Sequence, residues 1–94
     1  MVAASVTNRQ IPLVTAALDT ANATVTLTVS NSGSAAIIYT LTPNEYEGST
    51  QTVTVNGGGS TAVSWPTDPY GYYDVIITAN TSDGFTRRYA GRIA

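Results

Sequence analysis

The chain has 94 residues, of which 43% are hydrophobic, and carries six acidic residues against four arginines, with no lysine, histidine or cysteine. This length corresponds to one domain, in which roughly two thirds of the surface of the unfolded chain can be buried. The composition excludes disulfides, thiolate or imidazole metal sites, thiol nucleophiles and Schiff bases, and a net charge of −2 excludes a basic field for nucleic acid.

The first residues lack the charged segment and apolar run of a signal peptide. No apolar run approaches the roughly 20 residues that a transmembrane helix needs, so we expect no transmembrane segment. We expect residues 1–8 to be a flexible leading segment, or the start of an excised fragment, and residues 9–94 to form a single domain.

Alternation of apolar and polar side chains, typical of β-strands, recurs along the chain, and no window shows a sustained helical period. The alternation is strictest over residues 24–29, where Val25, Leu27 and Val29 share one face. Turn sequences separate such segments, and Pro43-Asn44 is expected to end the third. The expected strands are residues 11–18, 24–29, 35–42, 51–55, 60–65, 72–79 and 85–93. About seven short strands at this spacing predict an all-β, immunoglobulin-like or fibronectin-III-like antiparallel sandwich.

Aromatic residues gather around the turn between the fifth and sixth expected strands. Tyr73 has the same parity as Val75 and is the candidate for a tyrosine corner, in which the hydroxyl ties the turn back to the strand. Trp65 would close the end of the core in this architectural interpretation. In the functional alternative, Trp65, Tyr70 and Tyr72 form a patch that stacks on a sugar or holds a choline head group through cation–π contact.

The last expected strand is rich in arginine, and its alternation directs Arg88 and Arg92 to solvent. Arg87 has inward parity, so we expect its stem to be packed and its guanidinium to reach water. The hairpin places Asp74 roughly opposite residues 88–92. This arrangement predicts a cross-strand ion pair, an anion clamp of Arg88 and Arg92, or a face that docks onto a partner domain.

The acidic residues are spread over several loops and strands, and none of them forms a calcium-loop pattern. Asp68 and Asp74 could approach each other across a turn, but a two-carboxylate hydrolase also needs a cleft, which short loops rarely supply. We therefore expect no catalytic residue, no metal site and no cofactor in this chain.

The second half of the chain contains Val63-Ser64-Trp65, then Gly71-Tyr72-Tyr73-Asp74-Val75, and finally Phe85-Thr86-Arg87-Arg88-Tyr89-Ala90-Gly91-Arg92-Ile93. These segments resemble the C-terminal domain of bacterial phosphocholine-preferring phospholipase C of the non-haemolytic type. The closing strands of that family read approximately Gly-Trp-Tyr-Asp and Phe-x-Arg-Arg-Phe-Ala-Gly followed by Arg or His. Tyr72 stands where Trp is usual, and Tyr89 where Phe is usual. Val29-Ser30-Asn31-Ser32-Gly33 also resembles the family's strand-ending Asn-x-Gly.

The resemblance implies a non-catalytic accessory domain of a secreted or periplasmic hydrolase that cleaves phosphodiesters of the phosphatidylcholine or sphingomyelin type. The metal-dependent catalytic domain would lie N-terminal in the same polypeptide, and none of its catalytic residues maps onto this chain. The accessory domain would support the catalytic domain or bring it to a phospholipid surface. A stand-alone carbohydrate-binding or adhesin-type module is the alternative that sets the resemblance aside.

Overall fold

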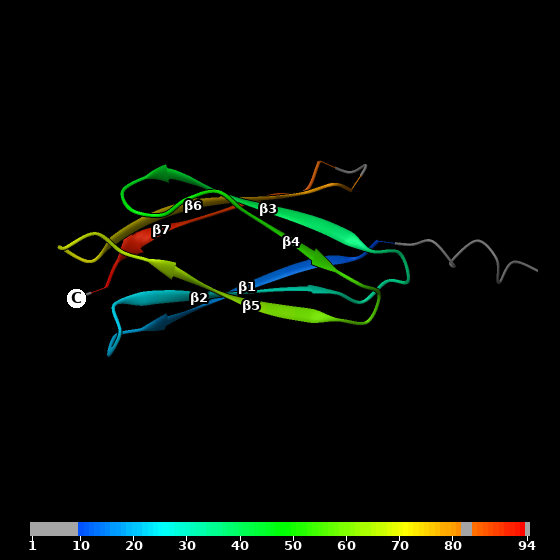
Figure 1. The fold of residues 1–94 in the computed structure, drawn as a ribbon, viewed down its shortest axis with the longest axis horizontal. Coiled ribbons are helices and arrows are strands. Elements are labelled where there is room, and N and C mark those ends of the chain that lie inside the picture. The colour runs from blue at the N-terminus through cyan, green and yellow to red at the C-terminus, as the bar shows by residue number, and fades with distance from the viewer. Residues whose placement is uncertain (1–9, 82–83, 94) are drawn as a thin grey trace, which may run out of the picture.

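The computed structural model describes residues 10–81 and 84–93, and the expected leading segment 1–8 therefore lies outside the described residues. Seven antiparallel strands form two stacked sheets, and the described residues contain no helix (Figure 1). The strands are β1 (Pro12–Asp19), β2 (Thr24–Asn31), β3 (Ile37–Glu45), β4 (Gln51–Val55), β5 (Ser60–Pro66), β6 (Tyr72–Ala79) and β7 (Thr86–Arg92). Each lies on an expected segment, so the predicted all-β sandwich is confirmed.

The strands are distributed as β1-β2-β5 in one sheet and β4-β3-β6-β7 in the other. In the immunoglobulin constant arrangement, the fourth strand lies in the sheet of the first, second and fifth strands. Here β4 pairs with β3 instead, with Thr52 opposite Thr40. The turn at residues 56–59 therefore carries the chain from one sheet to the other. Of the two arrangements expected, this is the fibronectin-III-like one.

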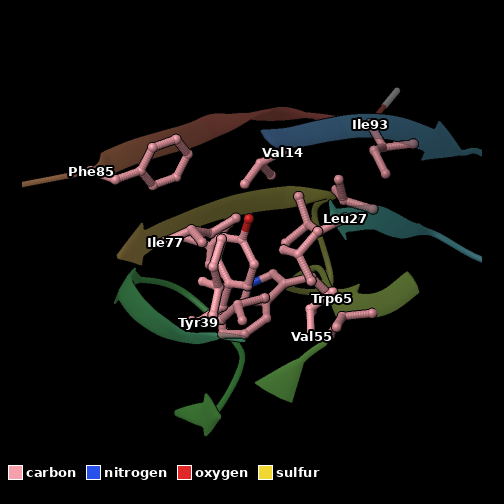
Figure 2. Packing of buried hydrophobic residues seen from close by; sticks show 14 residues of the cluster. Val14, Leu27, Tyr39, Val55, Trp65, Ile77, Phe85 and Ile93 are labelled. Carbon is pink, nitrogen blue, oxygen red and sulfur yellow. The ribbon is translucent and has the colours of Figure 1, made fainter. Parts of the chain in front are cut away.

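Alternation places the apolar side chains between the sheets, as expected. Val25, Leu27 and Val29 of β2 are fully buried, and so is every second residue of β3 from Ile37 to Leu41. The other buried apolar side chains are Val14, Val55, Val63, Trp65, Val75, Ile77, Phe85 and Ile93 (Figure 2). Burying each larger side chain contributes roughly 1.5–3 kcal/mol, so this core holds the two sheets together.

Two tyrosine hydroxyls join one sheet to the other. The Tyr39 hydroxyl on β3 donates to the carbonyl of Ser30 at 2.5 Å and accepts from the amide of Leu13 at 3.1 Å. The Tyr89 hydroxyl on β7 donates to the carbonyl of Val14 at 3.1 Å. Burial raises the pKa of Tyr39, so its phenol stays neutral and keeps its proton for this bond.

Asn31, at the end of β2, is a buried centre of hydrogen bonds. Its Oδ1 accepts from the amides of Ile11 and Gly33 at 3.3 and 3.0 Å. Its Nδ2 donates to the carbonyls of Ala35 and Val55 at 2.6 and 3.2 Å. One side chain therefore fixes the segment that leads into β1, the loop after β2 and the end of β4.

The strand β3 runs to Glu45, so the prediction that Pro43-Asn44 ends it is wrong. The pairing of β3 with β6 shifts register between Pro43 and Glu45. A bulge accommodates a proline, which has no amide hydrogen to give to the ladder, and lets the strand continue. Just beyond it Tyr46 takes a left-handed backbone conformation with φ of 64°.

The turn between β5 and β6 is closed by Asp68. Its Oδ1 accepts from the amides of Tyr70 and Tyr72, both at 2.9 Å. Tyr73 packs against the core as expected from its parity. Its hydroxyl, however, forms no hydrogen bond with the residues that the structure describes, so the expected tyrosine corner is not seen. The amides of the turn are bound by the short Asp68 side chain instead.

Candidate functional site

One surface pocket of about 430 Å³ lies on the outer face of the sheet β4-β3-β6-β7. It brings together the side chains that we name the tyrosine–arginine cluster: Tyr46, Tyr72, Asp74, Arg88 and Arg92. Ala90, between the two arginines on β7, and Gly91 leave the pocket open because their side chains are small or absent. Of the expected aromatic patch, Tyr72 lines this pocket beside the expected Asp74, Arg88 and Arg92.

Pairing of β6 with β7 places these residues. Tyr72 is opposite Arg92, whereas Asp74 is opposite Ala90 and two positions away from the partner of Arg88. Alternate residues of a strand point to the same face, so Tyr72 and Asp74 share the outer face with both arginines. Arg88 therefore reaches Asp74 along the diagonal of the hairpin.

The carboxylate of Asp74 is buried although it lies on the outer face. Only 3% of its side chain is exposed, against 58% for Arg88. Arg88 donates from Nε and Nη2 to the two carboxylate oxygens at 2.9 and 2.6 Å, and Asn44 donates to Oδ2 at 3.0 Å. The hydrogen bonds from Arg88, and to a smaller extent the one from Asn44, hold the pKa of Asp74 below its usual value. Arg88 is thereby fixed in direction, with Nη1 left for other partners.

The tyrosines form the other half of the cluster. The rings of Tyr46 and Tyr72 are stacked, with centroids 5.3 Å apart and planes 21° apart. The guanidinium carbon of Arg92 lies 5.4 Å from the centroid of Tyr72, and its Nε donates to the carbonyl of Tyr70 at 2.9 Å. The protein's own arginine thus holds the cation–π position on Tyr72 that a choline group would need.

Trp65 lies apart from this cluster. It is fully buried in the core with the parity of Val63, so it offers no surface to a ligand in this structure. Tyr70 is the most exposed aromatic residue of the described chain, at 72%, and it reaches the cluster through its carbonyl. Tyr46, which sequence reasoning missed, takes the place next to Tyr72. The register shift between Pro43 and Glu45 that precedes it has no signal in the alternation of the sequence.

The charged and aromatic groups of the cluster are engaged with one another. Asp74 has a lowered pKa and its oxygens are engaged, so at neutral pH it has no proton to give as a general acid. Asp68 is engaged in its own turn. In the described ranges, no three acidic residues gather as metal ligands would. Aromatic faces and guanidinium donors are what the cluster presents to a partner.

The family described as bacterial phospholipase C, C-terminal domain, matches residues 8–92. The chain belongs to this family. The resemblance seen in the closing strands is therefore confirmed, and the match to the phospholipase C C-terminal domain includes all seven strands and the whole tyrosine–arginine cluster. A search of the curated proteins finds no match. Nowhere in residues 10–81 and 84–93 does this domain have a helix long and apolar enough to cross a membrane.

Proposed function

We propose that this chain is a non-catalytic accessory domain of an exported bacterial phospholipase C. The catalytic domain lies upstream in the same polypeptide and cleaves phosphodiesters of the phosphatidylcholine or sphingomyelin type. The tyrosine–arginine cluster is the surface through which the accessory domain contacts its partner. Family membership supports the parent activity, and the make-up of the cluster supports the contact role.

The observation that carries this proposal is the preordering of the cluster. Tyr46 and Tyr72 are stacked, and the buried Asp74 holds Arg88 in a fixed direction. Tyrosine and arginine are the residues that dominate binding surfaces, because they bring large contact area and several donors. Side chains that are already ordered lose less entropy on binding. The cluster therefore has the features of a recognition surface.

The parent phospholipase C provides the test. We expect Tyr46→Ala combined with Tyr72→Ala to leave kcat on a water-soluble phosphodiester unchanged, and to lower either the rate on lipid or the melting temperature of the catalytic domain. Thr54→Ala is the matched control, because Thr54 is exposed on the outer face of the same sheet, on the edge strand β4. Turnover of the soluble phosphodiester by the isolated chain would contradict the proposal, and so would loss of kcat on that substrate in the double variant.

A further inference from the structure

Most of the exposed large hydrophobic side chains lie at one end of the sandwich. This end is formed by the β1–β2 turn, the β3–β4 loop and the β5–β6 loop (Figure 1). We name its exposed side chains Leu18, Tyr46, Tyr70 and Tyr72 the distal tip. Leu13 and Ile38, which are also exposed, are at the starts of β1 and β3 and so belong to the opposite end.

The described chain enters the sandwich at the end opposite the distal tip (Figure 1). The Gln10 side chain donates to the carbonyl of Ala36 at 2.9 Å, and the amide of Ile11 donates to Asn31 at 3.3 Å. These bonds fix the direction of the entering segment. A domain that precedes this one would therefore join the described chain at the end opposite the distal tip.

The loops of the distal tip are ordered by contacts of their own. Asp68 closes the loop that carries Tyr70, and Tyr46, whose backbone is left-handed, stacks on Tyr72. Tyrosine prefers the boundary between water and lipid, because its ring is apolar and its hydroxyl is polar. A leucine as exposed as Leu18, at 52%, gains free energy wherever it leaves water.

The charges around the tip limit which lipid surface it can approach. Asp19, Glu45, Glu47 and Asp68 lie in the strand ends and loops of this end. Arg88, which is paired with Asp74, and Arg92 are the cations of the tyrosine–arginine cluster on one side of this end. The excess of carboxylates is repelled by the negative potential of an anionic lipid surface, and this repulsion is absent at a zwitterionic surface.

We propose that the distal tip binds the surface of zwitterionic phospholipid bilayers, with Leu18 and Tyr70 in the interfacial layer. This inference rests on the proposed function, because it names the partner of the accessory domain. The tyrosine–arginine cluster forms one side of the tip, and Arg92 both orders Tyr72 and supplies donors for lipid phosphate groups.

The experiment is flotation of this chain with vesicles of phosphatidylcholine alone or mixed with phosphatidylserine. The chain encloses its own core, so it can be studied by itself. We expect binding to phosphatidylcholine that weakens as phosphatidylserine is added. Leu18→Ser and Tyr70→Ser should each weaken binding on the order of tenfold, since each removes a side chain from the interfacial layer. Leu13→Ser is the matched control: Leu13 lies on the same strand, is 58% exposed and is at the opposite end.

Three results would overturn the inference: no binding to phosphatidylcholine, stronger binding to the mixed vesicles, or equal loss in Leu13→Ser and Leu18→Ser. The proposed function is tested separately by the soluble substrate and by the melting temperature of the parent enzyme. If the chain does not bind vesicles but Tyr46→Ala with Tyr72→Ala lowers the melting temperature of the parent enzyme, the lipid partner is disproved. The accessory role is then retained. Turnover of the soluble phosphodiester by the isolated chain would instead disprove the non-catalytic role, whatever the vesicles show.

Discussion

Arg88 on β7 binds the buried carboxylate of Asp74 on β6 through two hydrogen bonds, although the two residues are not opposite each other in the hairpin. An ion pair between exposed groups contributes little, but here one partner is withdrawn from water. Asn44, at the bulge of β3, completes the shell of the carboxylate. The pair therefore links β3, β6 and β7 beneath the tyrosine–arginine cluster.

We expect Asp74→Asn to lower the free energy of unfolding by about 1–2 kcal/mol at neutral pH, because it removes charge-assisted hydrogen bonds and leaves Arg88 without a counter-charge. The pKa of Asp74 is lowered in the folded state, so its stabilising contribution is present above the unfolded value of about 3.9. The contribution is lost as the pH falls below that value towards the folded pKa. Urea unfolding of both proteins across this range measures the difference.

The difference between the two proteins should shrink in acid, because the wild-type carboxyl is then protonated as well. Asp19, whose pKa is also lowered, through hydrogen bonds from Asn22, is present in both proteins and cancels in the comparison. A gap that stayed constant from neutral pH down to strongly acidic pH would show that the charge of Asp74 does not stabilise the fold.

Removal of single tyrosine hydroxyls should separate the tyrosine that joins the sheets from the expected tyrosine corner. Tyr39→Phe leaves the partly buried amide of Leu13 and the carbonyl of Ser30 without their partner. We expect a loss of roughly 1–3 kcal/mol in thermal or urea unfolding. Tyr73→Phe should change the unfolding free energy little, because the Tyr73 hydroxyl bonds to none of the described residues. Equal losses in the two variants would contradict this assignment.

Strand positions and inward faces could be predicted because alternation is a local property of the sequence. Val25, Leu27 and Val29 are buried as their parity requires, and so are Trp65 and Val75. Hydrogen-bond partners could not be predicted in the same way. They depend on which groups lie within reach once strands have paired, and in this turn it is Asp68 that binds the amides of Tyr70 and Tyr72.

The candidate site could be predicted only in part. Asp74, Arg88 and Arg92 were expected near one another from hairpin pairing, and Tyr72 from the aromatic turn. Tyr46 could not be placed, because the bulge at Pro43 shifts the register by an amount that alternation does not encode. The burial of Asp74 could not be predicted either, since it depends on contacts with Asn44 of β3 and Arg88 of β7.

Asn31→Ala should be among the most destabilising polar substitutions in the chain. It removes an acceptor for two amides and a donor for two carbonyls in a site that is 1% exposed. We expect a loss of roughly 2–3 kcal/mol, measured by urea unfolding. Asn56→Ala is the control: Asn56 is exposed, and its change should stay within about 0.5 kcal/mol. A small loss at Asn31 would mean that water replaces its side chain.

Gly48 and Trp65 supply a prediction that can be measured by fluorescence, because the chain has a single tryptophan. A Cβ atom at residue 48 would lie 2.5 Å from Cζ2 of Trp65, and the φ of Gly48 is +126°. Gly48→Ala should therefore shift the emission of the buried indole to longer wavelength and destabilise the fold by about 1–3 kcal/mol. Gly58→Ala separates the strain of a positive φ from the steric contact with Trp65, since the φ of Gly58 is +77° and its Cβ would meet nothing within 4 Å. It should lose about 1 kcal/mol and leave the emission unchanged. If Gly48→Ala kept the wild-type emission and stability, the packing of the β3–β4 loop on Trp65 would be disproved, and with it the framework that positions Tyr46.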